Sequence, residues 1–379
     1  MTGLPGTALR VGIIGTGFMA SVHATAARSA GATVAAIAGR TPEGARQGAE
    51  RLGAERAASS AAELIGSDDV DVVHICTPNA QHAEYAALAL EAGKAVVCEK
   101  PLSTTGASAG ALTALAAERQ AVAAVPFVYR FYPAVREARA RLAAGGAGRL
   151  WLLHGTYLQD WLASAAGTDW RVDPAVGGGS RAFGDIGVHW CDLMEFVTGH
   201  RITSLTAFTA KAFPFRGAEG ASVPVDTEDG AALLFRTDQG AVGTLVVSQV
   251  SPGHKNRLWF SFEGTDSAVE FDQEQPDALR IGDTSSTRHV PVGHDLQTVE
   301  GRRYSMLPAG HPQGYQDAFN AFVADVLRTV RGEHVEGLPT FADGHRAALI
   351  TDAVLASAAS GGWVDVPPPL DHQPGTEHR

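Results

Sequence analysis

Short apolar runs alternate with helical stretches through the first 130 residues, and this pattern constrains the fold more than any other feature of the sequence. Such alternation indicates a parallel sheet built from right-handed crossovers. The expected strands are Leu9–Gly15, Thr33–Ala38, Val70–Thr77, Ala95–Cys98 and Val122–Tyr129, and the expected helices are Met19–Ser29, Pro42–Leu52, Ala80–Ala92 and Thr105–Glu118. We therefore expect a doubly wound α/β domain over residues 1–130.

After about residue 149 the strands follow one another with few helices between them. Thr237–Gly240 and Gly264–Ser267 are turn sequences of the kind that hairpins require. A largely antiparallel sheet in an α+β domain is therefore expected over residues 131–370, followed by a flexible tail, 371–379. Its expected strands are Leu150–Leu158, Ile202–Lys211, Ala231–Arg236, Ala241–Val250, Arg257–Glu263 and Ala268–Phe271, and its expected helices are Arg181–Thr198, Gly314–Arg331 and Phe341–Ser360.

The charge and cysteine content exclude several classes of protein. The formal net charge is −11, with no basic block, so nucleic acid and anionic membranes are poor partners. Cys76, Cys98 and Cys191 are scattered and odd in number, which argues against a disulfide framework and a structural zinc site. Met1–Leu9 lacks a signal core, and no run of about 18 apolar residues occurs. We expect a soluble cytoplasmic protein that holds no metal.

A glycine motif follows the first expected strand. Gly15-Thr16-Gly17-Phe18-Met19-Ala20 fits the pattern G-x-G-x-x-G/A and opens a helix inside a strand–helix–strand unit. Gly15 permits a tight turn, Gly17 lets a pyrophosphate approach the backbone, and Ala20 allows the helix to pack closely on the strand. The helix N-terminus, at Phe18 and Met19, then offers free N–H groups to phosphates. The alternative is an ordinary strand-to-helix turn, but the context favours a Rossmann dinucleotide site.

The end of the second strand bears on the choice of cofactor. It reads Gly39-Arg40-Thr41, without the acid that commonly binds the ribose hydroxyls of NAD. Arg40 is suited to pair with a 2′-phosphate, so NADP is favoured and NAD is the alternative. The alternative is that Arg40 is a solvated arginine at the start of a helix and binds no phosphate.

Two further loops follow strand ends. Ligands of an open parallel sheet bind at the carboxyl ends of its strands, so both loops are expected to face the cofactor. A partly buried lysine beside the positive nicotinamide ring can share in proton transfer near neutral pH, although a surface lysine is the commoner case. The Lys100–Pro101 bond is also a candidate for the cis form. The loop residues singled out are Thr77, Pro78, Asn79 and His82 in the first loop, and Glu99 and Lys100 in the second.

Asp185 and His189 stand four residues apart at the start of an expected helix. This spacing puts both side chains on one helical face, where the carboxylate would orient the imidazole for acid–base work. The alternative for Asp185 is a helix N-cap. No third and fourth metal ligands stand at a sensible spacing.

Four of the six tryptophans lie between Trp151 and Trp190, mixed with polar residues. Aromatic faces beside paired hydrogen-bonding groups suit a flat, hydroxyl-covered ring. Each tryptophan taken alone is more often a core residue. The candidate substrate-binding residues here are Tyr157, Gln159, Trp161, Trp170 and Arg171, together with Asp185 and His189.

These motifs together resemble the glucose–fructose oxidoreductase / inositol dehydrogenase / rhizopine catabolism (Gfo/Idh/MocA) family over about residues 10–366. The segment from Gly155 to Trp161 is similar to a stretch found in levoglucosan dehydrogenases and related sugar dehydrogenases. The motifs that carry the family resemblance are Val11–Ala20, Thr77-Pro78-Asn79 with His82, Glu99-Lys100-Pro101 and Gly184–His189.

The resemblance implies a Rossmann domain, a C-terminal domain with a large open sheet, and a homodimer or homotetramer. It also implies an NAD(P)-dependent dehydrogenase of a sugar, anhydrosugar or cyclitol, with Lys100, Asp185 and His189 as the catalytic set. We expect His189 to take the hydroxyl proton, Asp185 to hold His189, and Lys100 to stabilise the alkoxide, with the roles of His189 and Lys100 exchangeable. Two alternatives are a redox-neutral enzyme that retains its nucleotide while cleaving or eliminating a glycosidic substituent, and a non-catalytic NAD(P)-binding sugar sensor.

Overall fold

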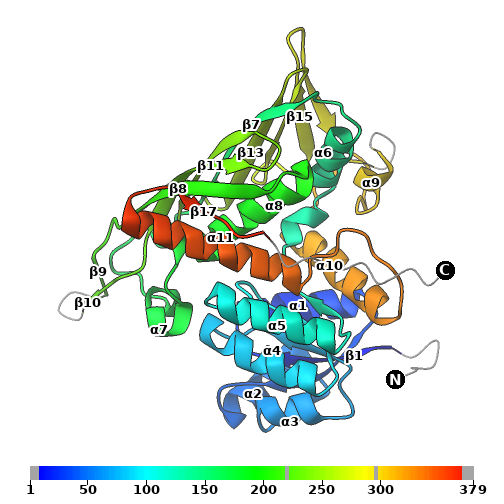
Figure 1. Cartoon of the computed structure of the whole chain (residues 1–379). Coiled ribbons are helices and arrows are strands. Elements are labelled where there is room, and N and C mark those ends of the chain that lie inside the picture. The colour runs from blue at the N-terminus through cyan, green and yellow to red at the C-terminus, as the bar shows by residue number, and fades with distance from the viewer. Residues whose placement is uncertain (1–7, 218–221, 294–297, 369–379) are drawn as a thin grey trace.

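The computed structural model describes residues 8–217, 222–293 and 298–368. The expected tail, 371–379, lies outside these residues. Two sheets dominate the fold, one built from the N-terminal third and one from the rest of the chain (Figure 1).

The first sheet is parallel throughout and has the order β3-β2-β1-β4-β5-β6, as expected of a doubly wound fold. Its strands are β1 (Arg10–Ile14), β2 (Thr33–Ala38), β3 (Arg56–Ala57), β4 (Val72–Ile75), β5 (Ala95–Cys98) and β6 (Ala123–Ala124). The helices are α1 (Phe18–Ser29), α2 (Pro42–Leu52), α3 (Ala61–Gly66), α4 (His82–Glu91) and α5 (Gly106–Glu118), with a 3₁₀ turn, η1 (Asn79–Gln81). The central strands are buried on both faces, which explains their continuous apolar sequences.

Within the described residues, the second sheet has nine strands in the order β16-β15-β14-β13-β7-β12-β11-β8-β17, of which only β7 and β12 pair in parallel. Both expected hairpins are present, as the pairs β11–β12 and β13–β14. The strands are β7 (Leu150–Leu158), β8 (Ile202–Ala210), β11 (Gly230–Thr237), β12 (Val242–Ser248), β13 (Arg257–Gly264), β14 (Ala268–Asp272), β15 (Ala278–Gly282), β16 (Thr287–Pro291) and β17 (Val364–Asp365). A separate two-stranded ribbon joins β9 (Phe215–Arg216) and β10 (Val223–Pro224).

Helices cover one face of this sheet and connect it to the first (Figure 1). α11 packs on β8 and α5, while α10 packs on α1. The other face of the sheet is open, since alternate residues of β11 and β12 are exposed. The helices of this half are α6 (Pro133–Ala143), α7 (Pro174–Gly177), α8 (Val188–Thr198), α9 (Val299–Arg302), α10 (Tyr315–Val330) and α11 (Phe341–Ser360), with short turns η2 (Val128–Phe131), η3 (Trp170–Val172) and η4 (Phe183–Gly187).

Two expected elements differ from the structure. The strand expected over Val122–Tyr129 is only two residues long, because the chain turns into η2 and carries Tyr129 towards the second sheet. The helix expected over Arg181–Thr198 is divided into a π-helical segment, η4, and α8. This division changes the geometry of the Asp185 motif.

Candidate active site

A cavity of about 1400 Å³ lies along the carboxyl edge of the first sheet and extends to β7, η4 and α8. This exceeds the roughly 300–1000 Å³ typical of drug-sized ligands and suits a dinucleotide with a second small molecule. Every residue singled out from the sequence lines the cavity except Ala20, which is buried against the sheet. The lining residues that the sequence analysis did not assign to the site include Ser59, Ser60, Tyr129, Asn256 and Tyr315.

The glycine turn fits a bound pyrophosphate. Gly15 has a φ of 122°, and a Cβ there would lie 2.5 Å from the carbonyl oxygen of Cys76. A Cβ on Gly17 would meet nothing within 4 Å, so open space faces this residue. α1 begins at Phe18 and has no side-chain cap at its N-terminus. Its first N–H groups are thus available to phosphate oxygens, as the sequence predicts.

Exposed polar groups surround the adenosine end of the cavity. Arg40 and Thr41 line it after β2, and Ser59 and Ser60 line it after β3. Thr41 caps α2 by accepting a hydrogen bond from the N–H of Gly44 at 3.1 Å. Among the described lining residues at this end none is acidic.

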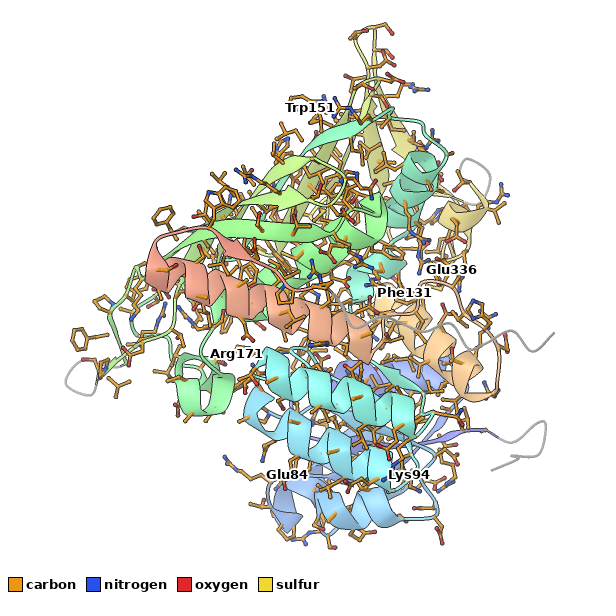
Figure 2. The ribbon with its side chains drawn as sticks, in the orientation of Figure 1. Glu84, Lys94, Phe131, Trp151, Arg171 and Glu336 are labelled. Atoms are coloured by element: carbon orange, nitrogen blue, oxygen red, sulfur yellow. The ribbon has the colours of Figure 1, made fainter. Side chains whose placement is uncertain are left out.

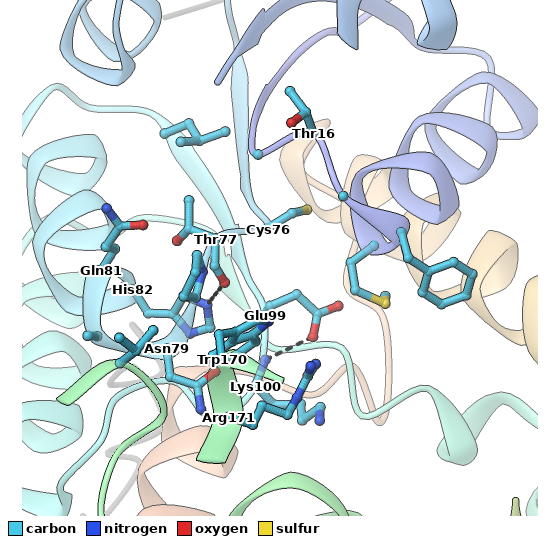
Figure 3. A pocket seen from close by; sticks show the side chains of 18 of the residues that line it. Thr16, Cys76, Thr77, Asn79, Gln81, His82, Glu99, Lys100, Trp170 and Arg171 are labelled. Carbon is cyan, nitrogen blue, oxygen red and sulfur yellow. Dashed lines mark hydrogen bonds between the residues drawn. The ribbon is translucent and has the colours of Figure 1, made fainter. Parts of the chain in front are cut away.

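The two loops after β4 and β5 are joined by His82. Its Nδ1 lies 2.7 Å from the carbonyl oxygen of Pro101 and its Nε2 lies 2.9 Å from that of Thr77, as Figure 3 shows in part. The side-chain amide of Asn79 donates to the carbonyl of Gly177 at 2.8 Å and so connects this edge to α7. The Lys100–Pro101 bond is cis, as the sequence suggested.

Lys100 and Asp185 form the centre of the site. Nζ of Lys100 donates to Oδ1 of Asp185 at 2.5 Å and to its backbone carbonyl at 2.8 Å. The amide of Gln249 donates to Oδ2 at 2.6 Å, and Nε of Arg171 lies 3.4 Å from Oδ1. Burial alone would raise the pKa of Asp185, but the charges of Lys100 and Arg171 lower it overall. The carboxylate is therefore ionised at neutral pH.

No hydrogen bond joins Asp185 to His189 in the described part of the chain, so the carboxylate does not orient the imidazole in the way that the spacing suggested. The carboxylate of Asp185 is engaged by Lys100 and Gln249, and Nδ1 of His189 is buried without a hydrogen-bond partner. The prediction assumed α-helical spacing, whereas Asp185 lies in the π-helical η4 and His189 in α8. The wider π turn changes the direction of the earlier side chain, and the positive charge of Lys100 attracts it.

His189 lies among aromatic rings. The rings of Phe127 and Tyr129 are perpendicular to the imidazole, with centroid separations of 5.6 Å and 5.1 Å, and the ring of Tyr157 is 6.4 Å away. Burial lowers the pKa of His189 well below its ordinary value, and the charge of Lys100 adds to the effect. The imidazole is therefore neutral near pH 7 and able to accept a proton.

A chain of hydrogen bonds borders the side of the cavity away from the glycine turn. The hydroxyls of Tyr129 and Tyr157 bond to each other, and both bond to the side chain of Asn256. Gln159 donates to Asn256 at 2.7 Å and accepts from the indole of Trp161 at 2.9 Å. These polar groups give the second sheet a hydrogen-bonding surface beside Lys100 and His189.

Arg171 lies over this end of the cavity, between the two sheets in Figure 2. Its guanidinium is 4.3 Å from the ring centroid of Trp170 and 5.8 Å from that of Trp161. Figure 3 shows Trp170 and Arg171 close to Lys100. The aromatic and polar groups expected to bind substrate are therefore gathered beside the catalytic candidates.

The residues that the structure describes contain neither a candidate metal cluster nor a candidate membrane span. No cluster of three or more His, Cys, Asp or Glu residues could hold a metal ion. No helix there is long and apolar enough to cross a membrane.

The fold and the cavity define a dinucleotide-binding oxidoreductase with a second domain beside the nucleotide. Residues 9–127 match the family described as "Oxidoreductase family, NAD-binding Rossmann fold", and residues 135–270 match the "GFO/IDH/MocA C-terminal domain". The chain belongs to the Gfo/Idh/MocA family.

Its relatives include proteins named as sugar and inositol dehydrogenases. Levoglucosan dehydrogenase of Pseudarthrobacter phenanthrenivorans is 33% identical over 395 residues, covering 95% of this chain and 98% of that protein. Inositol 2-dehydrogenase of Acidothermus cellulolyticus is 28% identical, covering 93% of each. A solved structure of levoglucosan dehydrogenase with NADH and levoglucosan has a TM-score of 0.89 at 33% identity, covering 95% of this chain and 100% of that one.

Proposed function

We propose that this chain oxidises a secondary hydroxyl carbon of a sugar, anhydrosugar or cyclitol. One observation carries this proposal: the Lys100–Asp185 pair and the neutral His189 line the same cavity. They lie between the glycine turn that suits a dinucleotide and a surface rich in hydroxyl, amide and indole groups. The named activities of the levoglucosan and inositol dehydrogenase relatives support the same class of substrate.

In this proposal each polar group has a separate task. The charged Nζ of Lys100, fixed by Asp185, donates a hydrogen bond to the substrate oxygen and stabilises its developing negative charge. His189 accepts the hydroxyl proton, because its imidazole is neutral at physiological pH. The nicotinamide, when bound, supplies the acceptor for the hydride. Lys100 and His189 can exchange these roles, whereas Asp185 acts through Lys100 rather than through His189.

We propose NADP as the preferred cofactor, with NAD as the alternative. Arg40 is exposed at the adenosine end, beside the hydroxyls of Thr41 and Ser60, and suits a 2′-phosphate. Structures of the levoglucosan dehydrogenase relative contain NADH, so both cofactors must be compared. The Michaelis constants for NAD and NADP, measured on the wild type and on Arg40→Asp, test this preference. We expect the wild type to have the lower constant for NADP and Arg40→Asp to lose that difference. Equal use of both by the wild type would refute the preference.

We also propose that residues 1–130 bind nucleotide and that residues 131–370 bind substrate and mediate a homodimer or homotetramer. The open face of the large sheet supports the assembly, because it exposes apolar side chains (Trp151 in Figure 2). The exposed residues on its strands include Trp151, Phe208, Leu234, Val242 and Val246. Light scattering that showed a monomer would refute the assembly.

A spectrophotometric screen tests the proposed reaction. NAD and NADP are each paired with pyranoses, anhydrosugars and inositols, and the appearance of reduced cofactor is followed for the wild type and Lys100→Ala. We expect reduction with one substrate class and a loss of about 10²–10⁴-fold in the variant. Nucleotide binding without net reduction on any substrate would favour the redox-neutral or sensor alternatives.

A further inference from the structure

Glu99 is a buried carboxylate that the proposed proton transfer does not use. It follows β5, lines the cavity, and is 6% exposed. Figure 3 shows it beside Lys100, on the same edge of the sheet as the glycine turn. An ionised group in such a position is costly unless it is paired and hydrogen-bonded.

Both oxygens of Glu99 have hydrogen-bond partners. The backbone N–H of Lys100 donates to Oε2 at 3.1 Å, and Nε2 of His23 lies 3.1 Å from Oε1. An ionised carboxylate only accepts, so His23 donates through Nε2. Nδ1 of His23 in turn lies 2.9 Å from Nδ1 of His74, and both imidazoles are fully buried. His23 belongs to α1, so the helix that opens at the glycine turn also orients Glu99.

The surroundings keep Glu99 ionised. Burial alone would raise the pKa of this carboxyl, but the hydrogen bond from His23 and the charge of Lys100 lower it overall. Lys100 is neutralised by Asp185, and Arg171 is shared between Asp169 and Asp185. Glu99 therefore supplies a further negative charge to the cavity beside Lys100.

A fixed negative charge distinguishes the two forms of a nicotinamide cofactor. The oxidised ring carries a positive charge and the reduced ring is neutral, so the attraction acts on the oxidised form alone. We propose that Glu99, oriented by His23, biases this site towards binding the oxidised cofactor relative to the reduced one. The inference rests on the proposed function, and it implies that Glu99 helps the oxidised cofactor to compete with the reduced cofactor for the site after the substrate has been oxidised.

Binding measurements on the full chain test this without relying on turnover. Dissociation constants for the oxidised and the reduced cofactor are measured by titration calorimetry for the wild type and Glu99→Gln. The glutamine has nearly the same shape and removes the charge, but it also places an NH2 donor against either His23 or the N–H of Lys100. We expect the ratio of the two constants to move by on the order of tenfold in favour of the reduced form. Glu99→Ala, which cannot mispair with His23, should move the ratio in the same direction.

Glu84→Gln is the matched control, because it removes an exposed carboxylate on α4 outside the cavity. Its ratio should equal that of the wild type. A ratio unchanged in both Glu99 variants, including equal weakening of the two cofactor forms, would overturn the inference. Failure of the wild type to bind either form would instead overturn the proposed function.

Discussion

The ammonium of Lys100 is held twice by Asp185, at 2.5 Å by a carboxylate oxygen and at 2.8 Å by the backbone carbonyl. Lys100 follows a strand of the first sheet, and Asp185 lies in the π-helical segment packed beside the second. The pair thus joins the two halves of the molecule at the reacting centre. Its geometry depends on what holds the carboxylate.

Gln249 binds that carboxylate but does not itself line the cavity. It is fully buried, and its amide donates to Oδ2 of Asp185 at 2.6 Å. We expect Gln249→Leu to lower turnover about tenfold, because a hydrogen bond to a charged group is worth roughly 1.5–3 kcal/mol and its loss lets Asp185 shift. Nucleotide affinity should remain unchanged. Steady-state rates and a nucleotide titration measure the two effects.

Gln239→Leu is the control for this change, since Gln239 donates to the carbonyl of Gly199 at an exposed position away from the cavity. It should leave turnover unaltered. If Gln249→Leu turned over at the wild-type rate, Lys100 and Arg171 would suffice to orient Asp185.

The two glycines of the nucleotide turn should respond differently to alanine. Gly17→Ala meets no protein atom within 4 Å, so we expect normal stability but at least tenfold weaker nucleotide binding, because the methyl occupies the phosphate space. Gly15→Ala should lower the free energy of unfolding by about 1–3 kcal/mol, since φ is 122° and the methyl would collide with the Cys76 carbonyl. Urea unfolding and nucleotide titration separate these effects. If Gly17→Ala bound the nucleotide with unaltered affinity, the phosphates would not bind beside Gly17.

The sequence revealed the parts of the site that depend on local pattern. The glycine turn is encoded within six residues, and Lys100 follows a strand whose carboxyl end must face the cavity. Asp185 and His189 were found from their spacing and from the family resemblance, but the π-helical turn was not foreseen. Nothing in the five residues Phe183–Gly187 indicates the wider turn, so the sequence did not reveal that the Asp185 carboxylate bonds to Lys100 and Gln249 and not to His189.

The residues that the sequence missed are brought to the site by long-range packing. Tyr129 was assigned to a strand end, yet the chain turns there and its hydroxyl meets Tyr157 on the second sheet. Asn256 and Gln249 lie in no motif. Gln249 reaches the site because it follows the last residue of β12, and Asn256 because it precedes the first residue of β13. A short-range pattern cannot record such partners, which are separated by 64 to 127 residues along the chain.

Asn256 should affect substrate binding more than chemistry. It bonds to Tyr129, Tyr157 and Gln159 but is not in contact with the Lys100–Asp185 pair. We expect Asn256→Ala to raise the KM for the sugar about tenfold through the loosened hydroxyl and amide groups, with a much smaller change in kcat. Asn320→Ala, on α10 outside the cavity, should leave both constants unchanged. A fall in kcat alone would place Asn256 in the catalytic step.

Stability should fall as the pH drops below about 6.5. Burial lowers the pKa values of His74, His82 and His189, so the unfolded chain takes up protons there that the folded chain does not. Each such histidine costs up to about 1.4 kcal/mol per pH unit below its unfolded pKa. Asp192 has the opposite effect on the free energy of unfolding and offsets about one of these histidines below pH 6. Burial raises its pKa to about 6, so the folded chain there binds a proton that the unfolded chain does not.

We therefore expect a net loss of about 2–3 kcal/mol in the free energy of unfolding between about pH 7 and about pH 5.5, measured by urea unfolding. His74→Gln should reduce this loss by about 1 kcal/mol, since it removes one of the buried imidazoles. His289→Gln, at an exposed position, should leave the loss unchanged. A stability that stayed constant over this range would show that the buried histidines do not remain neutral in the folded state.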